Sequence, residues 1–127
     1  MRATAASKRA APNDGALVTK AVLRASGRLD LTNRVVGRII GLSEASVSRM
    51  GTGSFVLSSR DKSFELALLF VRLFRSLDAI VGGDDAAAKA WLASENRVLR
   101  GVPRELIQTL PGLVNVVDYL DARRALV

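Results

Sequence analysis

Two glycines four residues apart, Gly37 and Gly41, most strongly restrict what this 127-residue chain can fold into. They lie in the stretch TNRVVGRIIGLSEASVSRMG, residues 32–51, which reads as two short helices. Gly41 suits a tight turn that needs a positive φ, and Gly37 suits a point where two helices cross closely. Apolar side chains occupy the positions that face the core of such a unit: Val36, Ile40, Leu42, Val47 and Met50. The spacing predicts a DNA-binding helix-turn-helix; the alternative is an ordinary helical hairpin with a glycine turn.

The basic residues are concentrated in the same half of the chain. Residues 1–60 contain ten Lys and Arg but only three Asp and Glu, whereas residues 61–127 contain nine of each. The whole net charge of +7 therefore lies in the half that contains the motif. A polyanionic partner for that half is the direct inference, with a solubilising basic face as the alternative.

Cysteine and histidine are both absent. Their absence excludes a disulfide framework and a zinc finger, and it removes the commonest general base and metal ligand. Ser58 and Ser59 near Lys62 are the nearest approach to a nucleophile with a base, and they fall in an expected loop. We therefore expect no enzyme, no catalytic residues, no metal and no cofactor.

The sequence shows neither a secretion signal nor a membrane span. Residues 1–13 lack an apolar central region, and the most apolar run, residues 64–81, is interrupted by Arg72, Arg75 and Asp78. We expect a cytoplasmic protein without a membrane partner.

Helix signals recur along the chain, which is 49% hydrophobic and contains only three prolines. Thr32 and Ser43 are expected to cap the two helices of the motif. A long helix is expected over 61–81 and is apolar over most of its circumference, so it should be buried on two sides. Gly82 ends it. Later helices are expected over 84–94, over 103–109 and from 113 onward, with a break at Pro111-Gly112.

These signals predict an all-α fold in which a long apolar central helix links an N-terminal helix-turn-helix bundle to a small C-terminal helical domain. The expected organisation is a flexible basic arm over 1–13, a helix-turn-helix domain over 14–60, the central helix over 61–83 and a C-terminal domain over 84–127.

The run that begins at Trp91 resembles the C-terminal toxin-binding domain of the Xre/MbcA/ParS antitoxins. The family pattern is Trp-Leu, then Asn, then Leu-x-Gly-x-Pro, then Leu, Gly and a last amphipathic helix. Those positions here are Trp91, Leu92, Asn96, Leu99, Gly101, Pro103, Leu106 and Gly112. The resemblance covers residues 62–127, and an Xre-type helix-turn-helix in front of it is the usual arrangement. The proline that usually precedes the Asn is missing here.

The resemblance implies the antitoxin of a type II toxin–antitoxin system. The partner of such proteins is typically a RES-domain toxin, an NAD-consuming or ADP-ribosylating enzyme whose active site the antitoxin covers, and the complex represses its own operon. The alternatives are a transcriptional regulator without a toxin partner and an adaptor that has lost DNA binding. A homodimer is expected, because symmetric dimers read two half-sites, together with a higher toxin–antitoxin complex.

The second helix of the motif carries the residues expected to contact operator DNA. Arg49 can bind guanine O6 and N7, Glu44 can accept from cytosine N4, and Ala45 can touch a thymine methyl group. The alternatives are a helix-terminus acid for Glu44 and a phosphate contact or a solvated arginine for Arg49. The short hydroxyl side chains suit phosphates. The full expected set is Thr32, Ser43, Glu44, Ala45, Ser46, Ser48 and Arg49.

Arginines of the second half are the candidates for toxin binding, because their planar fork binds carboxylates bidentately. The alternative for each of them is a solvated surface residue. Tyr119 is either an interface anchor or a core residue, and Trp91 is expected in the core. Val127 is a hypothesis for the group that enters the toxin cleft. Deleting roughly the last ten residues is expected to leave a folded DNA-binding protein that no longer silences its toxin. The full expected set is Arg97, Arg100, Arg104, Tyr119, Arg123, Arg124 and Val127.

Overall fold

The computed structural model describes residues 14–126, so the expected arm over 1–13 and Val127 lie outside the described residues. Seven α-helices and no strand form within 14–126, which confirms the all-α prediction. None of these helices is long and apolar enough to cross a membrane. Their bounds are α2 (Asp14–Arg28), α3 (Asn33–Ile40), α4 (Glu44–Thr52), α5 (Lys62–Ile80), α6 (Asp85–Ala93), α7 (Pro103–Leu106) and α8 (Leu110–Arg124).

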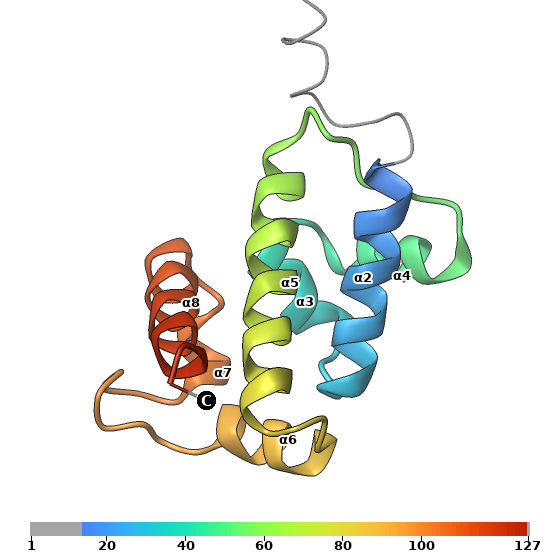
Figure 1. Cartoon of the computed structure of the whole chain (residues 1–127). Coiled ribbons are helices and arrows are strands. Elements are labelled where there is room, and N and C mark those ends of the chain that lie inside the picture. Colours follow the sequence, from blue (N-terminus) through green and yellow to red (C-terminus); the bar gives the residue numbers. More distant parts are fainter. Residues whose placement is uncertain (1–13, 127) are drawn as a thin grey trace, which may run out of the picture.

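Helix α5 lies at the centre of the fold, between α2 and α8 (Figure 1). It packs against α2 and α3 of the N-terminal half and against α8 of the C-terminal half. Phe70, Leu73 and Leu77 on α5 are at most 1% exposed. Burying a side chain of this size contributes roughly 1.5–3 kcal/mol. Helix α5 therefore supplies core side chains to both halves of the chain.

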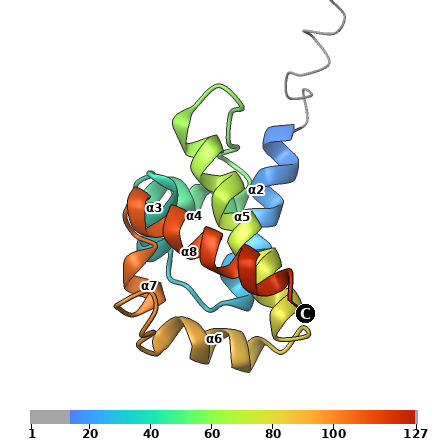
Figure 2. The ribbon, with the colours of Figure 1, turned by 60° about the vertical axis from the view of Figure 1, so that its left-hand side comes forward.

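Helix α8 lies across α5 (Figure 2). Its buried side chains are spaced so that they share one face of the helix, and they are Leu113, Val116, Val117 and Leu120. The neighbouring Ile107 is also fully buried. The C-terminal half thus has an apolar core that continues onto α5.

The boundary between the last two helices differs from the prediction. Helix α7 ends at Leu106, and α8 begins at Leu110, so Pro111 and Gly112 lie in the first turn of a helix. Proline is tolerated there because its missing N–H needs no partner within the helix, and Thr109 caps the turn by accepting from Gly112 N at 3.3 Å. A Cβ on Gly112 would lie 1.8 Å from the Leu106 carbonyl oxygen. The predicted break was wrong, because this Pro-Gly pair starts a helix.

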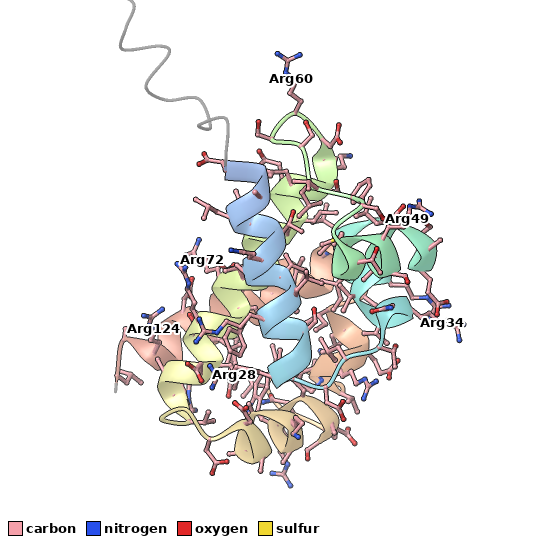
Figure 3. All side chains as sticks on the ribbon, turned by 90° about the vertical axis from the view of Figure 1, so that its right-hand side faces the viewer. Arg28, Arg34, Arg49, Arg60, Arg72 and Arg124 are labelled. Carbon is pink, nitrogen blue, oxygen red and sulfur yellow. The ribbon has the colours of Figure 1, made fainter. Side chains whose placement is uncertain are left out.

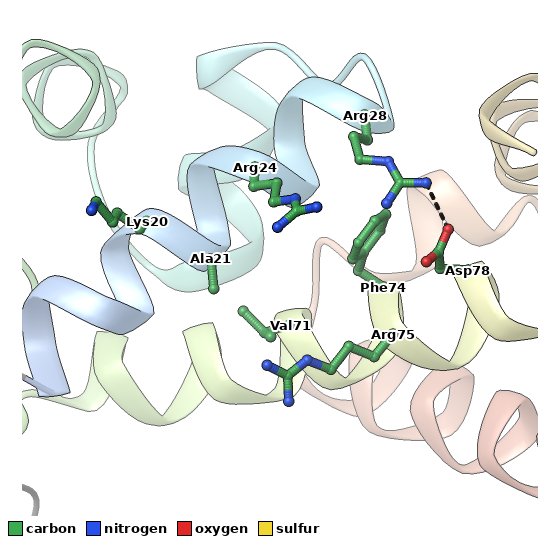
Figure 4. Close-up of a pocket in the computed structure, with 8 residues that line it drawn as sticks. All are labelled: Lys20, Ala21, Arg24, Arg28, Val71, Phe74, Arg75 and Asp78. Carbon is green, nitrogen blue, oxygen red and sulfur yellow. Dashed lines mark hydrogen bonds and ion pairs between the residues drawn. The ribbon is translucent and has the colours of Figure 1, made fainter. Parts of the chain in front are cut away.

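Arg28, in the last turn of α2, joins that helix to α5 and α6. Its Nη2 donates to Asp78 Oδ1 at 2.7 Å, and its Nε donates to Asp85 Oδ1 at 2.9 Å. The guanidinium carbon lies 4.9 Å from the centre of the Phe74 ring (Figure 4). The hydrogen bond from Arg28 lowers the pKa of Asp85, and burial opposes the shift. Arg28 therefore holds the end of α2 against α5 and α6 through hydrogen bonds to two carboxylates.

Candidate DNA-binding and partner-binding surfaces

The helix-turn-helix expected over residues 32–51 is present as α3 and α4. Both predicted caps are confirmed: Thr32 Oγ1 accepts from Val35 N at 3.2 Å, and Ser43 Oγ accepts from Ser46 N at 3.1 Å. Gly41 between the helices has a φ of 77°, in the left-handed region that favours glycine. Local signals in the sequence therefore place the start of each helix and the turn between them.

Close packing at Gly37 sets the angle between the two helices. A Cβ on Gly37 would lie 2.5 Å from the Leu42 carbonyl oxygen, so a larger residue would push α4 away from α3. Leu42 itself is half-buried. The other predicted core positions of the motif are at most 2% exposed, and they are Val36, Ile40, Val47 and Met50.

Helix α4 turns its polar side toward solvent. Arg49 Nη2 donates to Ser46 Oγ at 3.2 Å, and Ser43 Oγ donates to the same oxygen at 3.0 Å. These contacts lie along the exposed side of the first two turns. Ser46 is half-buried, and the other residues expected to contact DNA are exposed: Thr32, Ser43, Glu44, Ala45, Ser48 and Arg49. Their contact with bases stays a prediction.

Two exposed arginines on α3 lie outside the expected set of DNA contacts. Arg34 and Arg38 lie four residues apart, on one side of the helix. In a helix-turn-helix the first helix crosses the DNA backbone, so this side of α3 is placed for phosphate contacts. Arg34 projects on the same side of the molecule as Arg49 (Figure 3). The spacing of the two arginines on a polar helix face was the signal that could have identified them.

Asn96 organises the loop between α6 and α7. Its backbone N–H donates to Gly101 O at 2.8 Å, and its side-chain Oδ1 accepts from Leu99 N at 2.9 Å. Arg100 N donates to Asn96 O at 2.8 Å, and Arg100 has a φ of 63°. The Asn and Gly of the sequence pattern therefore build a closed loop.

The same loop presents an apolar residue between two cations. Val98 is 71% exposed, and Arg97 and Arg100 beside it are also exposed. A single exposed valine is ordinary, but one at a loop tip between two arginines is a candidate partner contact. Val98 was not among the expected site residues, since nothing in the sequence distinguishes it from a core valine.

Tyr119 and Arg123 form a second cluster, at the C-terminal end of α8. The rings of Trp91 and Tyr119 stack with centroids 6.2 Å apart, and the guanidinium carbon of Arg123 lies 5.8 Å from the Tyr119 centroid. Both aromatic residues are half-buried, so the expectation that Trp91 is a core residue holds only in part. Arg123 and Arg124 are exposed.

Arg104 is separate from these residues. It is half-buried on α7 and lines a groove with residues of α3. The residues expected to bind the toxin therefore fall into three groups: the loop between α6 and α7, the end of α8, and Arg104. Val127 lies outside the described residues.

The structure also contradicts the expected tolerance of a ten-residue C-terminal deletion. Such a deletion would remove Leu120, which is 1% exposed in the core, and Asp121, which binds Ser76 of α5. Losing a buried leucine costs several kcal/mol in a folded core. The end of α8 is thus part of the fold.

Two family comparisons match consecutive parts of the chain. Residues 8–72 match the antitoxin Xre-like helix-turn-helix domain. Residues 76–125 match the antitoxin Xre/MbcA/ParS C-terminal toxin-binding domain. The two matches meet within α5, the helix that packs against both halves. No curated protein matches the sequence.

Proposed function

Because the chain belongs to the family of Xre-like antitoxins, we propose that it neutralises a RES-domain toxin and represses its own operon. Its helix-turn-helix and toxin-binding domains make it a DNA-binding antitoxin of a toxin–antitoxin system. The tandem match of these two domains is the observation that carries the proposal. The resemblance adds the class of toxin, an enzyme that consumes NAD or transfers ADP-ribose from it.

In the proposed DNA complex, the exposed side of α4 enters the major groove. Arg49 then meets a guanine edge, and the hydroxyl of Ser48 lies one residue before it. The exposure of Ser48 and Arg49 supports this placement, because the neighbouring Val47 is buried in the core and the two polar side chains face solvent. A symmetric dimer would place two copies of α4 in successive major grooves, one helical turn apart.

In the proposed toxin complex, the loop between α6 and α7 and the end of α8 contact the toxin. Val98 and its flanking arginines would form one contact, and Tyr119 with Arg123 would form another. Aromatic residues and arginine are the side chains that most often dominate protein–protein affinity. This surface would cover the active-site cleft of the toxin.

The positions of the two surfaces support repression by the complex. Arg124 lies on the opposite side of the molecule from Arg34 and Arg49 (Figure 3). A toxin held near Arg124 would therefore leave α4 free to enter DNA. The complex, as well as the free antitoxin, could then occupy the operator.

Coexpression with the adjacent reading frame tests this function. We expect the neighbouring protein to stop growth alone, the antitoxin to restore growth and co-purify with it, and cellular NAD to fall when the toxin acts unopposed. A harmless neighbour, with operator binding intact, would favour a transcriptional regulator without a toxin partner. A toxic neighbour that leaves NAD unchanged would remove the RES assignment and keep the antitoxin assignment.

A further inference from the structure

A groove of about 420 Å³ separates α3 from α7. Figure 2 shows the two helices at the same edge of the molecule. Side chains from both helices and from the cap of α3 line the groove. Its polar and charged lining consists of Thr32, Arg34, Arg38, Arg104, Glu105 and Gln108. The groove therefore joins the helix-turn-helix to the toxin-binding domain.

The lining carries an excess of positive charge. Three arginines face a single acid, Glu105. None of Arg34, Arg38 and Arg104 forms an ion pair with a carboxylate of the described residues. By contrast, Arg28 has two carboxylate partners within the protein. The three cations of this groove are thus available to an external anion.

The position of α3 indicates which anion reaches the groove. When the second helix of a helix-turn-helix enters the major groove, the first helix crosses the adjacent backbone. Arg34 and Arg49 project on the same side of the molecule (Figure 3), so a duplex held by α4 passes along the exposed side of α3. Arg34 and Arg38 on one wall of the groove lie opposite Arg104 on the other.

We propose that this groove seats a segment of the operator's phosphodiester backbone between α3 and α7. Arg104 is then a DNA-binding residue, although it belongs to the toxin-binding domain and was expected to bind toxin. The proposal rests on the proposed function, because it needs α4 in the major groove. It adds a contact from outside the helix-turn-helix.

Glu105 gives the proposal a second, opposite consequence. It is exposed at the rim of the groove, where its carboxylate repels a phosphate. Removing that charge with Glu105→Gln should strengthen DNA binding, whereas Arg104→Ala should weaken it. A role of the groove in folding alone predicts no gain of affinity from Glu105→Gln.

The test measures the affinity of the full chain for the operator duplex and for an unrelated duplex over a series of KCl concentrations. A phosphate contact contributes about 0.9 to the slope of log affinity against log salt. We expect Arg104→Ala to lower that slope by about this amount on both duplexes, and Arg104→Lys to keep it. Arg75→Ala, at an exposed arginine of α5 outside both proposed surfaces, is the matched control and should leave the slope unchanged.

The variants separate failure of this proposal from failure of the proposed function. If Arg49→Ala weakens operator binding while Arg104→Ala and Glu105→Gln leave affinity and slope unchanged, the groove does not hold DNA and the proposed function stands. If the unmodified chain binds no operator, this proposal and the repression part of the proposed function both fail. Growth rescue by Arg104→Ala should persist; loss of rescue with an unchanged salt slope would assign Arg104 to the toxin and overturn the proposal.

Discussion

The hydroxyl of Ser76 on α5 donates a 2.7 Å hydrogen bond to Asp121 Oδ1 on α8. Ser76 is fully buried, and Asp121 also forms an ion pair with Arg72, one turn earlier on α5. An apolar interface alone tolerates small shifts of one helix along another, whereas a buried hydroxyl needs its acceptor at one position. The Ser76–Asp121 pair therefore fixes where α8 sits on the helix shared by both domains.

Asp121→Ala should destabilise the protein by roughly 1–3 kcal/mol, because it leaves the buried Ser76 hydroxyl without its acceptor and removes the ion pair with Arg72. Urea unfolding followed by circular dichroism measures the change. Asp118→Ala is the matched control, since Asp118 is exposed on the same helix and should change stability by less than about 0.5 kcal/mol. Equal effects of the two substitutions would contradict the role given to Asp121.

The contact between Arg28 and Asp85 predicts a pH dependence of stability. Because the hydrogen bond from Arg28 lowers the pKa of Asp85 in the folded state, the contribution of this contact is fully present above the unfolded value of about 3.9. It is lost as the pH falls through the lower folded pKa. The stability difference between the unmodified chain and Asp85→Asn should be constant from about pH 5 to 7 and shrink below about pH 4. If the stability difference between the unmodified chain and Asp85→Asn does not change below about pH 4, the charge of Asp85 contributes nothing to stability.

Gly37 and Gly51, both in helices of the motif, should respond oppositely to substitution by alanine. Gly37→Ala should destabilise by about 1–3 kcal/mol, because its Cβ would collide with the Leu42 carbonyl oxygen. Gly51 is exposed, with nothing within 4 Å of an added Cβ, so Gly51→Ala should stabilise by about 0.5–1 kcal/mol. Thermal unfolding of both variants tests this. If both substitutions raise the unfolding temperature, or both lower it, glycine at position 37 is not needed where the two helices cross.

The helix-turn-helix was predictable because its signals are local. A cap hydroxyl, a left-handed glycine and apolar residues at helical spacing each act within a few residues, and Thr32, Gly41 and Ser43 take the predicted roles. The start of α8 was predicted wrongly although local signals for it were present. Thr109 caps the helix and Pro111 lies in its first turn, but a Pro-Gly pair usually marks a break.

The grouping of the arginines depends on tertiary packing. From the sequence, Arg97, Arg100 and Arg104 are near neighbours and suggest one basic surface. In the structure, the loop closed by Asn96 presents the first two, whereas Arg104 on α7 faces α3. Helix α3 lies about sixty residues earlier in the chain, so no local pattern relates it to Arg104.

DNA binding and toxin neutralisation should be separable by single substitutions on opposite sides of the molecule. Arg49→Ala should weaken operator binding by ~1–3 kcal/mol, because it removes a bidentate contact to a base, and should leave neutralisation intact. Arg124→Ala should weaken toxin binding by about 1 kcal/mol and leave operator affinity unchanged. Gel shifts and pull-downs with the same two variants give both readouts. Loss of both activities in either variant would indicate a folding defect, which circular dichroism would detect.

Val98 should be an anchor for the toxin, because it is 71% exposed at the tip of a loop that Asn96 holds closed. Val98→Asp places a charge where the proposed contact is apolar, so the variant should fold normally, bind the operator and fail to co-purify with the toxin. Val56→Asp is the matched control: Val56 is 52% exposed in a loop of the DNA-binding half. Its substitution should leave toxin binding unchanged. If Val98→Asp still neutralises the toxin in a growth assay, the loop lies outside the interface, and the end of α8 must supply the contact alone.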